Sequence, residues 1–161
     1  MQAKEIKKDI YWVGVKDWNL REFHGYATPH GSTYNSYLIM DEKITLVDGV
    51  KSYMSQEMTE RVKSVVDFSQ ISYVVVNHVE MDHSGNIPEI MKLAPQAVII
   101  TDNAGKMALE AHFDTAGWNH SDAALAGFDD DLCQRGKAAV VKRRFRPASG
   151  LRRAVCQRAA A

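Results

Sequence analysis

The stretch from Tyr73 to Gly85 reads YVVVNHVEMDHSG, and it joins an apolar run to a loop rich in imidazole and carboxylate groups. The run Tyr73–Val76 has the length and the β-branched composition of a buried strand. Loops that leave such strands are firmly anchored and open to solvent, and in α/β proteins they often carry functional side chains. We therefore predict a binding site directly after this strand.

Four potential metal ligands lie within that loop, namely His78, Glu80, Asp82 and His83. The alternating residues His78, Glu80 and Asp82 could converge, while His83 would turn toward a second centre. Imidazole and carboxylate ligands suit iron, manganese or zinc, and the lack of cysteine in the loop argues against an iron–sulfur site. The alternative is a polar loop whose His and Asp only cap the next helix. The density of ligand types favours a metal site.

The chain before Trp118 alternates between strand-like and helix-like segments. Strands are expected at residues 10–15, 37–40, 44–47, 73–76 and 97–101, and helices at residues 54–66, 87–93 and 103–113. The strands at 37–40 and 44–47 should form a hairpin, and residues 23–31 a turn-rich loop. Strands that alternate with helices predict a layered α/β fold.

The composition is that of a soluble globular protein, with 161 residues, 45% hydrophobic and 25% charged. The apolar runs are too short to span a bilayer, and the N-terminus lacks the apolar segment of a signal peptide. Two cysteines, Cys133 and Cys156, provide no disulfide framework and suit a reducing compartment. We therefore expect a cytoplasmic protein without a membrane partner.

Residues 119–161 differ in composition from the rest of the chain. They hold nine Lys or Arg and four Asp, a balance of +5 within a chain whose total charge is zero. With only two aromatic residues, Phe128 and Phe145, this segment has little from which to build a core, so we expect a disordered basic tail. Stacking aromatics do not accompany its basic residues, and this disfavours a selected nucleic-acid role.

The loop motif has a more specific parallel. The pattern His-x-Glu-x-Asp-His at residues 78–83 resembles the flavodiiron variant of the metallo-β-lactamase-fold signature, in which Glu80 stands where most hydrolases have a second His. Residues 23–26, 28–39 and 46–48 also resemble the opening segments of flavodiiron proteins. The resemblance covers residues 1–118 and implies the first half of a metallo-β-lactamase-like αββα sandwich.

The resemblance also implies a non-haem di-iron centre. His78 and Glu80 would ligate one iron, and Asp82 and His83 the other. His24 and Asp48 would contact these ligands without binding iron themselves. Family enzymes reduce dioxygen to water or nitric oxide to nitrous oxide, with electrons from an FMN in a C-terminal flavodoxin-like domain. They form head-to-tail homodimers or tetramers and accept electrons from rubredoxin-like or flavin donors.

The sequence departs from the family after Trp118, where three further iron ligands and the flavodoxin domain are not found. Reading each codon one base late permits two of the missing motifs, Leu-His-Trp-Pro-Asp-Ser from residues 121–130 and Ser-Asn-Asp-Ala-Phe-Gly from residues 141–149. Our hypothesis is that the reading frame is lost near Asn119 and that residues 119–161 are out of frame. The chain would then be a fragment with an incomplete iron site, inactive alone.

Two other functions stay open on the sequence. The chain could be a zinc-dependent hydrolase of the metallo-β-lactamase fold, although Glu80 and the lack of a downstream His ligand disfavour this. It could also be a non-catalytic metal-binding module. Metal content distinguishes these readings, because two irons per chain would indicate an assembled site, and one weakly bound metal or none would indicate a fragment.

Overall fold

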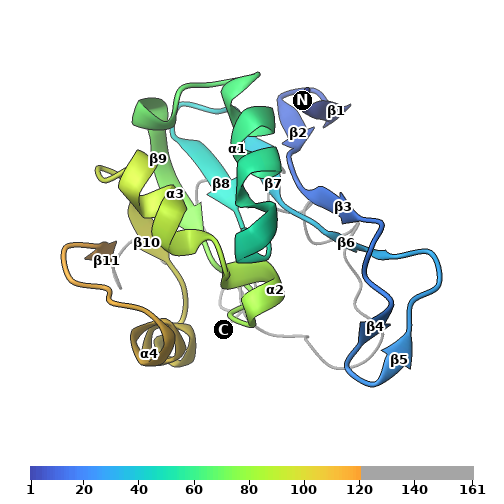
Figure 1. The fold of residues 1–161 in the computed structure, drawn as a ribbon. Coiled ribbons are helices and arrows are strands. Elements are labelled where there is room, and N and C mark those ends of the chain that lie inside the picture. Colours follow the sequence, from blue (N-terminus) through green and yellow to red (C-terminus); the bar gives the residue numbers. More distant parts are fainter. Residues whose placement is uncertain (121–161) are drawn as a thin grey trace, which may run out of the picture.

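A computed structural model describes residues 1–120, in which seven strands form one mixed sheet with helices packed against it (Figure 1). The spatial order is β1-β2-β7-β8-β9-β10-β11. The strands are β1 Lys4–Lys7, β2 Ile10–Trp12, β7 Tyr37–Ile39, β8 Ile44–Val47, β9 Ile71–Val75, β10 Val98–Ile100 and β11 Asn119–His120. Neighbours from β1 to β8 pair antiparallel, and neighbours from β8 to β11 pair parallel.

Four α-helices connect or follow the parallel strands: α1 Ser55–Lys63, α2 Met81–Ser84, α3 Ile87–Leu93 and α4 Asn103–His112. Short 3-10 turns, η1 Ser52–Met54 and η2 Phe68–Gln70, lie on either side of α1. Helix α1 is amphipathic and buries Met58 and Val62, and Pro88 in the first turn of α3 suits a helix start. Figure 1 shows α1 and α3 lying against the same face of the sheet.

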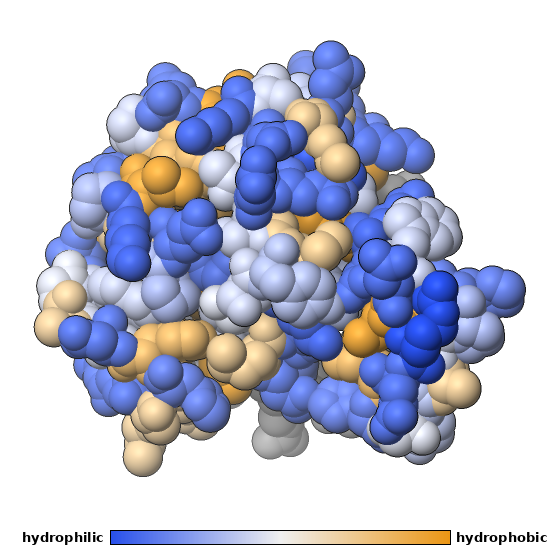
Figure 2. Space-filling view, viewed as in Figure 1, coloured by the Kyte–Doolittle hydropathy of each residue, from blue (hydrophilic) through white to orange (hydrophobic). Residues whose placement is uncertain are grey.

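Side chains of the central parallel strands alternate between two apolar clusters. Leu46, Val74 and Ile99 pack with α1 and α3, whereas the residues that follow each of them, Val47, Val75 and Ile100, pack in a second cluster with Ile10 and Ile39. Both faces of the central sheet are therefore apolar. This explains why the sequence of these strands reads as continuous hydrophobic runs. The helix-bearing side of the molecule carries mainly hydrophilic residues with separate apolar patches (Figure 2).

Two small sheets lie apart from the main sheet (Figure 1). Strand β3 (Val15–Asp17) pairs with β6 (Ser32–Tyr34), and β4 (Glu22–Phe23) pairs with β5 (Tyr26–Ala27) in a short hairpin. The expected turn-rich loop at residues 23–31 therefore holds a hairpin. Its turn is possible because His24 and Gly25 both adopt positive φ angles.

Most of the expected elements are confirmed. Strands β7 and β8 form the predicted hairpin, α1 lies within the predicted helix 54–66, and α3 has the predicted bounds. Strand β9 overlaps the run predicted at residues 73–76, and β10 lies within the run predicted at residues 97–101. The α/β fold class predicted from this order of elements is therefore confirmed for the described part of the chain.

Three expectations about local structure are wrong. The single strand expected at residues 10–15 breaks into β2 and β3 at Gly14, where the chain lies so close to Tyr34 that an added β-carbon would be 2.2 Å from its carbonyl oxygen. The loop at residues 78–86 contains the helical turn α2. Asn103, a candidate cap of the final helix from its sequence, is instead the first residue of that helix, and the Asp102 carboxylate caps it by accepting from Gly105 N at 2.7 Å.

The predicted tail begins inside the described part of the chain and extends beyond it. Asn119 and His120 form β11, parallel to β10. The disorder predicted for the remainder, residues 121–161, lies outside the described residues. Within residues 1–120, no helix has the length and apolar character needed to cross a membrane.

Candidate metal centre

The predicted ligand loop starts where two parallel strands end side by side. Val47 at the end of β8 is in register with Val75 at the end of β9. Asp48 follows β8, and Asn77 and His78 follow β9, so the two loops leave the same edge of the sheet. Neighbouring carboxyl ends of parallel strands are a common place for ligand sites in α/β folds.

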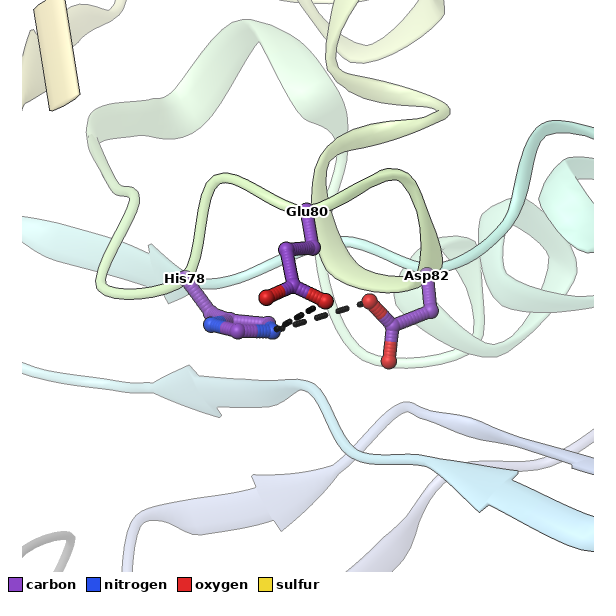
Figure 3. A group of neighbouring side chains, drawn as sticks. All are labelled: His78, Glu80 and Asp82. Carbon is purple, nitrogen blue, oxygen red and sulfur yellow. Dashed lines mark ion pairs between the residues drawn. The ribbon is translucent and has the colours of Figure 1, made fainter. Parts of the chain in front are cut away.

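His78, Glu80 and Asp82 point toward one another (Figure 3), and one potential ligand atom from each lies within 4.8 Å of the other two. His78 Nε2 is 3.8 Å from Glu80 Oε2 and 3.6 Å from Asp82 Oδ1. Two carboxylates and one imidazole at this spacing could share one cation. The convergence that the alternating sequence predicts is present.

Helix α2 creates this convergence by reversing the chain. Glu80 precedes the helix in an extended conformation, and its carbonyl accepts from the backbone N–H groups of His83 and Ser84 at 2.9 and 2.8 Å. The side chains of Asp82 and His83 consequently face inward, at 13% and 20% exposure, while Glu80 is 59% exposed. The site therefore has a partly buried end and an end open to solvent.

Asp82 lies between the two imidazoles of the motif. Its Oδ1 faces His78, and its Oδ2 is 3.7 Å from His83 Nε2. The rings of His78 and His83 are 5.3 Å apart, edge to face. His83 Nδ1 is buried without a hydrogen-bond partner in the described part of the chain. A buried polar atom without a partner is costly, and a cation is one of the partners that could satisfy it.

His24 approaches the same site from the β4–β5 hairpin. Its Nε2 is 3.6 Å from Glu80 Oε2, and its φ angle of 51° places it in the left-handed region. The side chain is 61% exposed. The structure thus places the predicted supporting residue His24 beside the most exposed donor of the loop.

Asp48, the other predicted supporting residue, contacts the backbone of the loop. Its Oδ1 accepts from Asn77 N at 2.7 Å and from His78 N at 3.2 Å. Burial raises the pKa of the Asp48 carboxyl, although the nearby His83 and these hydrogen bonds oppose the rise. Its φ of 55° directs the chain away from β8 so that the carboxylate reaches the loop. Asp48 therefore holds the start of the ligand loop.

Asn86 fixes the other end of the loop, and the sequence analysis did not single it out. It is 1% exposed, and its Oδ1 accepts from Val50 N at 2.8 Å, while Gly49 N donates to His83 O at 2.7 Å. Its Nδ2 lies 3.5 Å from Ser55 Oγ on α1. In the sequence, Asn86 reads only as the residue before a helix, and no pattern marks it as a bridge between distant segments.

The donor set fits the ions predicted from the sequence. Two imidazoles and two carboxylates are ligands for iron, manganese or zinc. Among the described residues, the cluster of converging donors is contributed by a single short segment, 78–82. A tightly held ion generally needs a full set of ligands in fixed geometry, so this set is suited to an ion whose remaining ligands come from elsewhere.

The chain is similar to several known proteins. The model of the ODP family of beta lactamases matches residues 33–133, beyond the end of the resemblance expected at Trp118. A nitric oxide reductase from Moorella thermoacetica is 41% identical over 122 residues, and a rubredoxin-oxygen oxidoreductase from Megalodesulfovibrio gigas is 42% identical over 119. These matches cover 74% and 73% of this chain. The chain spans 31% and 30% of the length of these relatives.

Solved structures give the same result. The flavodiiron protein from Giardia intestinalis superposes with a TM-score of 0.72 at 33% identity, over 75% of this chain and 30% of that one. A metallo-β-lactamase from Cronobacter sakazakii superposes with a TM-score of 0.54 at 16% identity, over 68% of this chain and 37% of that one, and shows a shared fold alone. The chain thus belongs to the ODP family, as the N-terminal metallo-β-lactamase-like domain of flavodiiron proteins.

Proposed function

We propose that the loop at residues 78–83 is the iron-binding part of a flavodiiron centre that reduces dioxygen to water or nitric oxide to nitrous oxide. The observation that carries this proposal is the convergence of His78, Glu80 and Asp82 within 4.8 Å. The relatives' names, nitric oxide reductase and rubredoxin-oxygen oxidoreductase, support both substrates. Bound iron would supply the site at which electrons pass to dioxygen or nitric oxide.

The four ligands have separate roles in this proposal. His78 and Glu80 would hold one iron, and Asp82 and His83 the other. Asp82 Oδ2 faces His83, which supports this pairing, whereas Oδ1 faces His78 and brings Asp82 within reach of the first iron as well. His24 would steady the exposed Glu80 carboxylate, and Asp48 would hold the backbone from which His78 projects. The buried end of the site limits the access of water to Asp82 and His83.

This chain spans 31% and 30% of the length of two relatives, so the electron donors are proposed for a longer protein of that kind. We propose that electrons come from a rubredoxin-type or flavin donor through an FMN in a flavodoxin-like domain. The names rubredoxin-oxygen oxidoreductase and flavorubredoxin among the relatives support a rubredoxin-type donor. Head-to-tail homodimers or tetramers in the cytoplasm would complete the enzyme.

We also propose that the reading frame changes near the end of the described region, so that later ligands of the centre are encoded out of frame. The two shifted motifs in residues 121–149 support this. The ODP match runs to residue 133 and so overlaps the first shifted motif at residues 121–130, and that overlap cannot be in frame in both. Genomic DNA across the junction tests the idea, because codons incompatible with the shifted motifs would contradict it.

The proposed function predicts a weak and incomplete iron site in this chain. Anaerobic titration of the full chain with ferrous ion, followed by elemental analysis, should give at most one weakly bound iron and no consumption of oxygen or nitric oxide, because an incomplete ligand set cannot fix two metals. A tightly bound iron pair with oxygen consumption would contradict the fragment proposal. Selective binding of zinc with hydrolytic activity would favour the hydrolase alternative.

A further inference from the structure

The β4–β5 hairpin that carries His24 has few attachments of its own. Within residues 1–120, its two strands pair only with each other, through Glu22 with Ala27 and Phe23 with Tyr26. Its base is closed by Thr28, whose N–H donates to Arg21 O at 2.9 Å. At the tip, a β-carbon added to Gly25 would meet nothing within 4 Å. Pairing within the hairpin cannot by itself keep His24 against the metal loop.

Lys51 is the residue that joins this hairpin to the rest of the site. Its Nζ lies 5.1 Å from the ring centre of Phe23 on β4. The same Nζ lies 5.3 Å from the ring centre of Tyr34 and 5.9 Å from that of Tyr53. Three aromatic faces thus surround one ammonium group. Contacts of this kind stabilise a cation at these distances, most strongly where water is partly excluded.

Two of the three rings are held in place by a shared carboxylate. Tyr34 OH donates to Asp17 Oδ2 at 3.1 Å, and Tyr53 OH donates to the same oxygen. Asp17 is buried and also accepts from the backbone N–H groups of Asn19 and Leu20. Tyr34 and Tyr53 are therefore held in place beside Lys51, and Phe23 on the hairpin is the third ring that the ammonium group contacts.

The backbone of Lys51 stands on the frame that also supports the metal ligands. The preceding residues Gly49 and Val50 are hydrogen-bonded to His83 and Asn86. Lys51 Cα is 3.4 Å from the position that a β-carbon of Gly85 would occupy. At the other end of the contact, the Phe23 ring centre is 4.1 Å from that of His24, whose Nε2 faces Glu80. A continuous chain of contacts thus runs from Lys51 through Phe23 and His24 to Glu80.

We infer that Lys51 is a positioning residue that latches the β4–β5 hairpin over the metal loop and so fixes His24 against the Glu80 carboxylate. The latch itself is a property of the metal-free fold, and its effect on ion binding rests on the proposed iron site. Lys16 provides a matched control, since its Nζ lies 5.7 Å from the exposed ring of Trp18, a residue of neither the hairpin nor the ligand loop.

The latch is tested by NMR hydrogen exchange of the metal-free full chain. Lys51→Met keeps most of the side-chain bulk without its charge, and it should speed exchange of the hairpin amides and Thr28 N–H by about tenfold. Lys51→Arg should restore the parent rates to within about twofold, because a guanidinium also stacks on aromatic faces. Unchanged rates in Lys51→Met, or an equal rise in Lys16→Met, would overturn the inference.

Ferrous-ion affinity then tests the consequence for the site. Lys51→Met should weaken binding by about tenfold, the scale expected when a group that orients a ligand is lost. In a His24→Ala background, Lys51→Met should have no further effect on affinity, because Lys51 acts through His24. An undiminished effect in that background would overturn the positioning role. If the parent chain binds no iron, the proposal that this loop alone holds iron fails while the fragment hypothesis stands, and the exchange rates still decide whether the latch exists.

Discussion

Replacing Asp82 with Asn is expected to lower the affinity of the chain for ferrous ion by more than about a hundredfold. This exceeds the loss of about 10- to 100-fold that follows removal of a residue that only hydrogen-bonds a metal ligand. The change keeps the shape of the side chain but removes its charge and one of the oxygens that face His78 and His83. Anaerobic titration monitored by absorbance or by tryptophan fluorescence would measure the loss.

The control for this experiment is Asp9→Asn. Asp9 lies far from the ligand loop in sequence, before β2, and its φ of 63° is a conformation that Asn accepts readily. This variant should bind ferrous ion like the parent chain. Circular dichroism should show the same folded state for both variants, since the Asp82 side chain makes no hydrogen bond that supports a helix or strand within residues 1–120. Parent-like affinity in Asp82→Asn would mean that the loop does not bind iron through this carboxylate.

Replacing Asp48 with Gly is expected to lower the free energy of unfolding by about 2 kcal/mol, because the backbone N–H groups of Asn77 and His78 lose their acceptor. Glycine is the informative substitution at this position. It accepts the positive φ of Asp48 without strain, so no backbone strain adds to the loss of the carboxylate. Urea denaturation of the metal-free chain measures the effect.

Two companion variants separate the contributions of Asp48. Asp48→Asn keeps an oxygen in place and tolerates the left-handed backbone, so it should lose less than Asp48→Gly. Asp48→Ala should lose about 1 kcal/mol more than Asp48→Gly, because its β-carbon is strained at this φ. Equal stability of Asp48→Gly and the parent chain would show that water replaces the carboxylate at no cost.

The elements that sequence reasoning located well are those whose side chains face apolar surroundings on a regular period. Strands β9 and β10 are buried on both faces, so their continuous apolar runs mark them clearly. Helix α1 shows the spacing of an amphipathic helix. The ligand cluster was also predictable, because His78, Glu80 and Asp82 come from one short segment and their proximity is local.

The features that sequence reasoning missed depend on contacts between distant segments. Nothing near Asn86 in the sequence indicates that its amide bonds to Val50, 36 positions away. Likewise, Lys51 reads as an ordinary surface lysine, because the rings around it come from β4, β6 and η1. Helix α2 escaped prediction because four residues carry too little periodic pattern to distinguish a helical turn from a loop.

The buried amide of Asn86 also fixes the stage of folding at which the ligand loop becomes ordered. Because this one side chain ties the turn after the donors to the loop after β8 and to α1, the donor segment becomes ordered together with the core. The entropy of ordering the donors is thus lost during folding, and capture of an ion adds little to it. An incoming ion should therefore meet a rigid, ready arrangement of imidazole and carboxylate groups, and ion exchange should proceed without unfolding of the surrounding helices.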